Sequence, residues 1–263
     1  MVNITDIVEP RIAPYRNLKI NSRFQKDSNI FIAEEKKVVL KLLNSNLEVL
    51  SCFAVPEFYN EHKEIIEMKA IPKENLFYAN KDIMNKIVGF RLHSGVMAIS
   101  KIPEQTSIEY LKPPIVVMNG IINSENVGAI VRNAAAFDIQ SIIFDNETSS
   151  PYLRRAVRVS MGTIFGMDYY HSESLKEDLA LLKEKFNYTI TAIELTNSAI
   201  PIEDYKFTQE SIIIFGNEGQ GINTGILGIC DNIVCIPISD KVDSLNVAAT
   251  SAIVFHHINK NNI

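Results

Sequence analysis

The stretch Ile212–Gly221 reads IIIFGNEGQG and joins an apolar run to a loop with three glycines. Four consecutive apolar residues predict a short strand that is buried on both faces. The glycines allow positive φ and let backbone N–H and C=O groups approach a flat ligand closely. Their spacing matches neither a P-loop nor a dinucleotide-binding fingerprint. Because open α/β sheets bind ligands where their strands end, the loop marks a candidate site.

Similar short apolar segments alternate with helical patterns through the rest of the C-terminal half. Strands are predicted at 115–118, 141–144, 167–170, 188–195, 211–215 and 232–238. Helices are predicted at 126–137, 152–160, 175–186 and 245–258. This alternation predicts an α/β fold whose parallel sheet is covered on both faces.

The first hundred residues predict a separate, smaller α/β unit. Helices are predicted at 34–44, 57–69 and 81–88, and strands at 48–55, 76–78 and 95–100. Residues 1–22 lack clear periodicity and are interpreted as an arm, so the small domain covers 23–101. A polar segment with three prolines predicts a linker at 102–114, because proline cannot sit inside a regular helix or a central strand. The second domain then covers 115–263.

The composition is that of a globular protein, and its negative net charge disfavours binding nucleic acid through overall electrostatic attraction. The chain has 263 residues and a net charge of −5, so any contact with nucleic acid must come from a local basic patch. Arg154, Arg155 and Arg158 lie three and four residues apart on a predicted helix and form the preferred candidate for binding nucleic-acid phosphates. A second basic set near the start is equally consistent with a solvated face; it comprises Arg11, Arg16, Lys19, Arg23, Lys26, Lys36 and Lys37.

The cysteines and the N-terminus bear on the cellular compartment. Cys52, Cys230 and Cys235 form no CxxC pair, and Cys230 and Cys235 have no histidine at metal-ligand spacing. We interpret them as reduced structural thiols and predict no metal site. The N-terminus has no basic stretch followed by an apolar core, and no apolar run has the length of a membrane span. These features favour a cytoplasmic protein that does not bind membranes.

Two further clusters follow predicted strands in the same way as the glycine loop. Asn126 and Arg132 lie early in a predicted helix, where free N–H groups and the helix dipole favour anions. The other cluster begins at Ile236-Pro237 and ends at Ser244-Leu245-Asn246, before an alanine-rich helix. Ser244 stands where a helix N-cap is expected, and the Asn246 amide is available to fix a substrate or the Glu218 carboxylate.

Together, the three clusters resemble the signature motifs of the SpoU (TrmH-like) branch of the SPOUT RNA methyltransferases, and the likeness covers residues 112–260. The family transfers a methyl group from S-adenosylmethionine to a ribose 2′-hydroxyl of RNA. The resemblance implies a SPOUT-type parallel sheet with a C-terminal trefoil knot, and a homodimer in which both chains help to form the site. It also implies that the first domain is an L30-like module for substrate RNA, in which the glycine that commonly opens the first helix is replaced around Glu34-Glu35.

The resemblance also implies roles for particular residues. It assigns catalysis to Arg132 as activator and orienter of the ribose hydroxyl, with positioning by Asn126, Glu218, Ser244 and Asn246. It assigns cofactor binding to Gly216, Asn217, Gly221, Ile236, Ile238, Leu245 and Asn246. No metal is required, because the leaving thioether is neutral. The family's usual methionine after Ile-Pro is Ile238 here, and its usual glycine two positions further is Asp240.

Three alternatives stay open at this stage. The substrate is either ribosomal RNA, which is favoured because an added N-terminal module is frequent among enzymes acting on it, or transfer RNA. The second alternative is that the enzyme methylates a base instead of a ribose, as enzymes of other SPOUT branches do. A non-catalytic RNA-binding or ribosome-assembly protein would keep the fold without the chemistry.

Overall fold

The computed structural model describes residues 1–16, 18 and 29–261, and the chain divides into two compact units. The first unit contains Met1–Pro103 together with Tyr152–Phe165, and the second contains Glu104–Pro151 and Gly166–Ile263. The division after Pro103 falls inside the segment predicted as a linker. None of the described helices combines the length and the apolar run needed to cross a membrane.

The first unit is built on a five-stranded mixed sheet with the order β1-β4-β3-β5-β2. Its strands are β1 (Val2–Asn3), β2 (Ile30–Glu34), β3 (Val49–Ala54), β4 (Leu76–Tyr78) and β5 (Val96–Lys101). Its α-helices are α2 (Lys36–Leu43), α3 (Pro56–Glu61), α4 (Lys63–Met68), α5 (Lys81–Val88) and α7 (Arg154–Val159). Short 3₁₀ turns are η1 (Pro10–Tyr15), η2 (Lys73–Asn75) and η4 (Thr163–Gly166), of which η4 ends in the second unit.

The structure differs from the sequence prediction at both ends of this unit. Residues predicted as an arm are built into it, since β1 pairs with β4 and Ile12 and Tyr15 are fully buried in its core. The predicted boundary between residues 22 and 23, together with Lys19, Arg23 and Lys26, lies outside the described residues. The segment Tyr152–Phe165 was predicted as part of the second domain, yet α7 packs on β2 of the first unit.

The second unit is a seven-stranded, wholly parallel sheet with the order β10-β12-β9-β11-β6-β7-β8. The strands are β6 (Ile115–Asn119), β7 (Ser141–Asp145), β8 (Asp168–Ser172), β9 (Thr189–Ile193), β10 (Ile200–Pro201), β11 (Ser211–Gly216) and β12 (Asn232–Cys235). The helices are α6 (Ser124–Ala136), α8 (Leu175–Phe186), α9 (Thr224–Leu227) and α10 (Val247–Asn261), with 3₁₀ turns η3 (Ile108–Tyr110) and η5 (Ile202–Asp204). The predicted α/β fold with a parallel sheet is confirmed.

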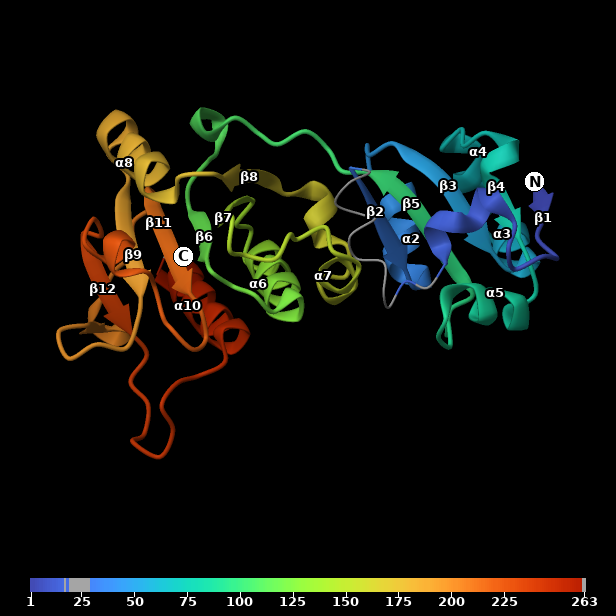
Figure 1. The fold of residues 1–263 in the computed structure, drawn as a ribbon. Helices are drawn as coiled ribbons and strands as arrows, with labels where there is room; N and C mark the ends of the chain where they lie inside the picture. The colour runs from blue at the N-terminus through green and yellow to red at the C-terminus, as the bar shows by residue number, and fades with distance from the viewer. Residues whose placement is uncertain (17, 19–28, 262–263) are drawn as a thin grey trace. The chain divides into compact units, whose positions relative to one another are not determined.

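Strand β11 shows why the sheet needs helices on both faces. Successive side chains of a strand point to opposite faces. Ile212 and Ile214 pack in one cluster with Leu179 of α8, whereas the ring of Phe215 meets that of Phe255 in α10 at 5.5 Å between centroids. Helices α10 and α6 lie side by side (Figure 1). A strand that is apolar on both sides therefore occupies the middle of the sheet.

Candidate functional site

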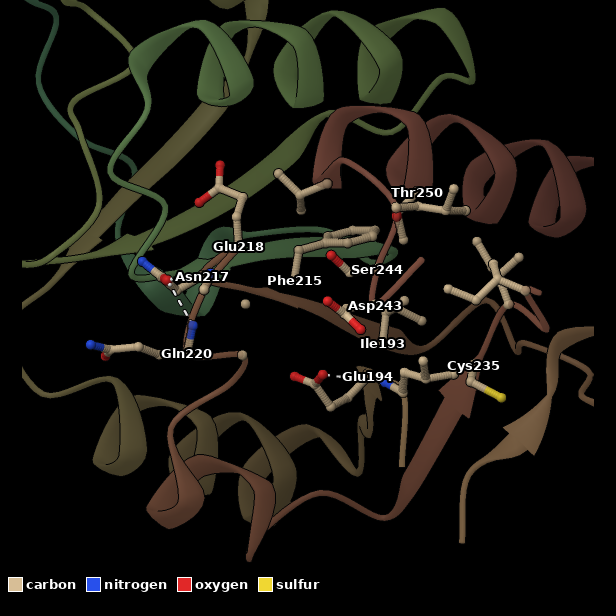
Figure 2. Close-up of a pocket in the computed structure, with 18 residues that line it drawn as sticks. Ile193, Glu194, Phe215, Asn217, Glu218, Gln220, Cys235, Asp243, Ser244 and Thr250 are labelled. Carbon is tan, nitrogen blue, oxygen red and sulfur yellow. Dashed lines mark hydrogen bonds between the residues drawn. The ribbon is translucent and has the colours of Figure 1, made fainter. Parts of the chain in front are cut away.

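A cavity of ≈ 350 Å³ lies at the carboxyl ends of β9, β11 and β12 (Figure 2). It is lined by Ile193, Glu194, Leu195, Phe215, Gly216, Asn217, Glu218, Gly219, Gln220, Gly221, Cys235, Ile236, Ile238, Asp243, Ser244, Leu245, Val247 and Thr250. Its size falls within the range of small-molecule sites, and its position is where parallel sheets bind ligands.

The glycine loop is closed on itself by the side chain and backbone of Asn217. The backbone N–H of Asn217 donates to the Gly221 carbonyl at 3.1 Å, and the Gly221 N–H donates back to the Asn217 carbonyl at 2.9 Å. The Asn217 Oδ1 accepts from the backbone N–H groups of Gly219 (2.8 Å) and Gln220 (3.0 Å), while its Nδ2 donates to the Gly120 carbonyl at 2.7 Å. The loop therefore has a defined shape that is anchored to the end of β6.

Two of the three glycines are required, Gly216 by its close approach to backbone atoms and Gly221 chiefly by its backbone conformation. A Cβ at Gly216 would lie 2.5 Å from the backbone nitrogen of Ile222, and one at Gly221 would lie 2.6 Å from the Glu194 Oε2. Gly221 also has a φ of +72°, which side chains with a Cβ rarely adopt. Gly219 is different, because a Cβ there would reach only ordinary contact with Asn217 at 3.5 Å.

Three segments far apart in the sequence meet through Asn126. Its Nδ2 donates to the Oε1 of Glu218 in the glycine loop. Its Oδ1 accepts from the Asn246 Nδ2 at 3.2 Å. One amide of α6 thus joins the glycine loop to the segment before α10, which is the convergence that the sequence clusters predicted.

Asn246, rather than Ser244, caps α10. The helix begins at Val247, and the Asn246 Oδ1 accepts from the Ala248 backbone N–H at 2.9 Å. The prediction that Ser244 caps this helix is therefore wrong by two residues. Ser244 instead lines the cavity together with Leu245. The predicted contact between Asn246 and Glu218 is indirect, because Asn126 stands between them.

The cavity contains most of the residues that were expected to hold a cofactor. Gly216, Asn217, Gly221, Ile236, Ile238 and Leu245 line it, whereas Asn246 does not. Glu194 and Asp243 also line the cavity and were missed. Glu194 could have been found, because it lies just past β9, and the strand-end rule applies to that strand as well.

The structure does not bring Arg132 to the lining of this cavity. It lies in the middle of α6, six residues after Asn126, and its side chain is exposed. Since a helix turns about 100° per residue, the two side chains leave α6 in different directions. Within the residues that the structure describes, Arg132 forms no ion pair.

The three arginines predicted as an RNA-binding patch lie in the first unit, and two of them pair with a carboxylate instead of forming a free cationic surface. Arg154 Nη1 lies 2.6 Å from the Glu34 Oε2, and Arg158 Nη1 lies 3.2 Å from the Oε1 of the same carboxylate. The side chains of Glu34 and Arg154 are 2% and 12% exposed, so this ion pair belongs to the interior of the unit. The Arg154 guanidinium also lies over the Phe90 ring at 4.9 Å from its centroid. Arg155 is exposed, and Arg158 is half-exposed.

The thiols of the chain have pKa values that keep them protonated at neutral pH. Burial raises the pKa of Cys52 to about 12 and that of Cys230 to about 11, and it also raises the pKa of Cys235, whose side chain lines the cavity. All three are free cysteines. The Cys235 thiol therefore contributes an apolar surface rather than a nucleophile.

Comparison with known families gives a match to the second half of the chain. The model of the SpoU rRNA methylase family matches residues 113–256, which include the glycine loop, Asn126 and Asn246.

Individual relatives and solved structures are similar over longer stretches. An uncharacterized tRNA/rRNA methyltransferase of Mycobacterium bovis is 30% identical and is matched over 97% of this chain and 90% of its own length. The 23S rRNA (guanosine-2′-O-)-methyltransferase RlmB of Acinetobacter baylyi is 25% identical over 68% of this chain and 75% of its own. Among solved structures, the AdoMet-bound rRNA methyltransferase of Sinorhizobium meliloti superimposes with a TM-score of 0.84 at 17% identity, covering 99% of this chain and 98% of that one.

Proposed function

The chain belongs to the SpoU rRNA methylase family, and from this premise we propose that it methylates ribose 2′-hydroxyls of RNA with S-adenosylmethionine. The observation that carries the proposal is the link from Asn126 to Glu218 and Asn246, which gathers the three motif segments beside one cavity. The RlmB relative, whose name specifies guanosine 2′-O-methylation of 23S rRNA, supports ribose as the acceptor and ribosomal RNA as the substrate. Transfer RNA stays the alternative.

The cavity has the chemistry that this cofactor needs. Apolar side chains of Ile193, Phe215 and Val247 offer a surface for a purine ring, and the glycine loop exposes backbone polar groups beside them. S-adenosylmethionine would supply an electrophilic methyl group on a positively charged sulfur. In this proposal Gly216, Ile236 and Leu245 hold the adenine and ribose through their backbones, as the family resemblance implies.

The remaining site residues act on the substrate. Glu218 and Asn246 are held by Asn126, so their positions are fixed before a substrate arrives, which lowers the entropic cost of orienting the ribose. Ser244, at the rim of the cavity, is proposed to contact the same sugar. Arg132 is proposed to activate and orient the 2′-hydroxyl.

Because Arg132 does not line the cavity of its own chain, we propose that it acts on the cavity of a second copy in a homodimer. Helices α6 and α10, which carry Arg132 and the exposed Ile253, are candidates for the shared surface.

We also propose that the C-terminal segment forms the family's trefoil knot and that the first unit is an L30-like module for RNA. Arg155 and Arg158 stay candidates for RNA phosphates, and a cytoplasmic location stays a prediction.

The first test is the Arg132→Ala variant. We expect methyl transfer to fall by at least about 100-fold, since positioned groups that assist proton transfer contribute roughly that much, while S-adenosylmethionine still binds by calorimetry. Unchanged turnover would contradict the role of Arg132. Absence of any binding of S-adenosylmethionine by the unaltered protein would favour the non-catalytic RNA-binding alternative.

A mixed dimer of two variants distinguishes whether Arg132 serves the cavity of its own chain or that of the second copy. An Arg132→Ala chain keeps an intact cavity, and a Gly216→Ala chain keeps its arginine. If Arg132 serves the partner's cavity, mixing the two impaired variants restores one complete site per mixed dimer, and methyl transfer rises above the sum of the two variants measured separately. If the arginine serves its own cavity, mixing gives no such gain. The natural substrate can be identified by mass-spectrometric mapping of ribose methylation in total RNA with and without the gene.

A further inference from the structure

The cavity is lined by three carboxylates, those of Glu194, Glu218 and Asp243. Among the described residues that line it, none is lysine, arginine or histidine. Glu218 is engaged by Asn126, and Figure 2 shows its carboxylate directed away from the other two. Glu194 and Asp243 are therefore the charged groups available to a ligand inside the cavity.

Glu194 is held in place by the glycine loop. Its Oε2 accepts from the backbone N–H of Ile222 at 2.9 Å, and its Oε1 accepts from the N–H of Leu195 at 3.2 Å. The space for this carboxylate exists because Gly221 lacks a side chain, since a Cβ there would lie 2.6 Å from the Oε2. The loop thus fixes a negative charge at the wall of the cavity. The Asp243 carboxylate comes from the loop between β12 and α10, so the two charges reach the cavity from separate segments.

A carboxylate in such a cavity stabilises a positive charge by simple Coulomb attraction. At the effective dielectric of about 20 that applies near protein surfaces, one carboxylate within about 8 Å changes the affinity of a singly charged group by a factor of about ten or more before salt screening. S-adenosylmethionine carries a positive sulfonium, whereas its product S-adenosylhomocysteine has a neutral sulfur and otherwise the same charged groups. The ratio of the two affinities therefore isolates the effect of the sulfonium charge.

We propose that Glu194 and Asp243 make the cavity discriminate by charge, so that it binds the sulfonium donor more tightly than the neutral thioether product. This inference rests on the proposed function. When the methyl carbon bonds to the ribose oxygen, the carbon–sulfur bond breaks with its electron pair left on sulfur, and the hydroxyl proton is released. The cavity then holds a neutral sulfur beside two carboxylates, which favours departure of the product.

The test measures binding of three ligands by calorimetry: S-adenosylmethionine, S-adenosylhomocysteine and sinefungin, in which an amine-bearing carbon replaces the sulfonium. For the unaltered protein we expect S-adenosylmethionine and sinefungin to bind about ten-fold more tightly than the thioether. Glu194→Gln and Asp243→Asn should each lower this preference about three-fold or more. Raising the salt concentration should lower it too, because exposed charges are screened.

The chain offers a matched control in Asp240→Asn, which removes the same charge from the same loop at a residue that does not line the cavity. Its preference should equal that of the unaltered protein. In Glu194→Gln the amide oxygen can still accept from Ile222, and thermal unfolding checks that the fold is kept. If that variant does not fold, Asp243→Asn, on an exposed loop, still decides the question.

The outcomes separate this inference from the proposed function. Equal affinity for the three ligands, or a preference that both variants leave unchanged, would overturn the charge discrimination and leave the methyltransferase assignment intact. If none of the three ligands binds, the proposed function itself fails.

Discussion

Glu34 and Glu218 each bind a side chain far along the sequence, but they do so in opposite surroundings. The carboxylate of Glu34 is 2% exposed and pairs with Arg154, 120 residues away. The carboxylate of Glu218 is exposed and accepts from Asn126, 92 residues away. A buried charge must be neutralised by a partner or it destabilises the fold, whereas an exposed one can be oriented and still be open to a ligand. The first contact therefore supports structure, and the second is suited to function.

The largest expected effect comes from removing the partner of the buried charge. Among the described residues, Arg154→Ala would leave the buried Glu34 with the half-exposed Arg158 as its remaining ion-pair partner, and it would also remove the contact with the Phe90 ring. We expect the free energy of unfolding to fall by about 3–5 kcal/mol in urea denaturation. Arg91→Ala, at an exposed arginine of the same unit, should change it by less than about 0.5 kcal/mol. Equal effects of the two variants would mean that the ion pair contributes little.

The link at the exposed carboxylate should matter for catalysis more than for stability. Asn126→Ala removes the contacts to both Glu218 and Asn246, and we expect kcat for methyl transfer to fall about 10- to 100-fold through lost positioning. The control is Asn133→Ala on the same helix, whose Nδ2 also bonds α10, at the Ala248 carbonyl (2.8 Å) and the Ser251 Oγ (2.9 Å). That variant should lower stability by about 1 kcal/mol with little change in kcat. A similar kcat for both variants would show that Asn126 only braces the helices.

A smaller effect is expected from the shape of the glycine loop. Gly216→Ala places a Cβ 2.5 Å from the Ile222 nitrogen, so the backbone must shift, and we expect the affinity for S-adenosylmethionine to fall about ten-fold or more. Gly219→Ala meets only ordinary contact and should bind within about two-fold of the unaltered protein. Calorimetric titration of both variants distinguishes them, and equal losses would show that loop flexibility, rather than close approach, accounts for the glycines.

The smallest expected effect concerns Glu35, next to the buried Glu34. It precedes α2 with a φ of 78° and a ψ of 140°, a conformation that glycine adopts without strain. This is where the family resemblance placed a missing glycine. Glu35→Gly should stabilise the chain by about 0.5–1 kcal/mol in thermal unfolding, after the greater chain entropy of glycine is subtracted. A loss of stability would indicate that the Glu35 side chain makes a contribution larger than the backbone strain.

Several elements could be predicted because their signals are local. Helix α8 spans Leu175–Phe186 as predicted, since its apolar residues recur at helical spacing and the polar cluster at residues 172–174 precedes it. Helix α5 and strand β4 also match their predicted bounds.

Strand β2 was missed, and residue 34 was assigned to a helix instead. All five of its residues are buried, and Phe31 contacts the rings of Tyr152 and Phe165 at 5.3 and 5.4 Å between centroids. The apolar run Ile30–Ala33 gives the same local signal as the run before the glycine loop, whereas the rings that cover Phe31 come from a segment that begins 121 residues later, which no local pattern reveals.

The sequence by itself determined the residue types that the chemistry needs: the glycine loop after an apolar strand, the two asparagines and Glu218, and with them the family. Those residues are recognisable because close backbone approach and amide or carboxylate contacts allow few substitutes. Only the tertiary structure decided that Arg154 neutralises a buried carboxylate, that Asn126 stands between Glu218 and Asn246, and that Arg132 does not line the cavity of its own chain. Each of these depends on which distant segment lies within a few ångströms, and burial then decides whether a charge serves the core or a ligand.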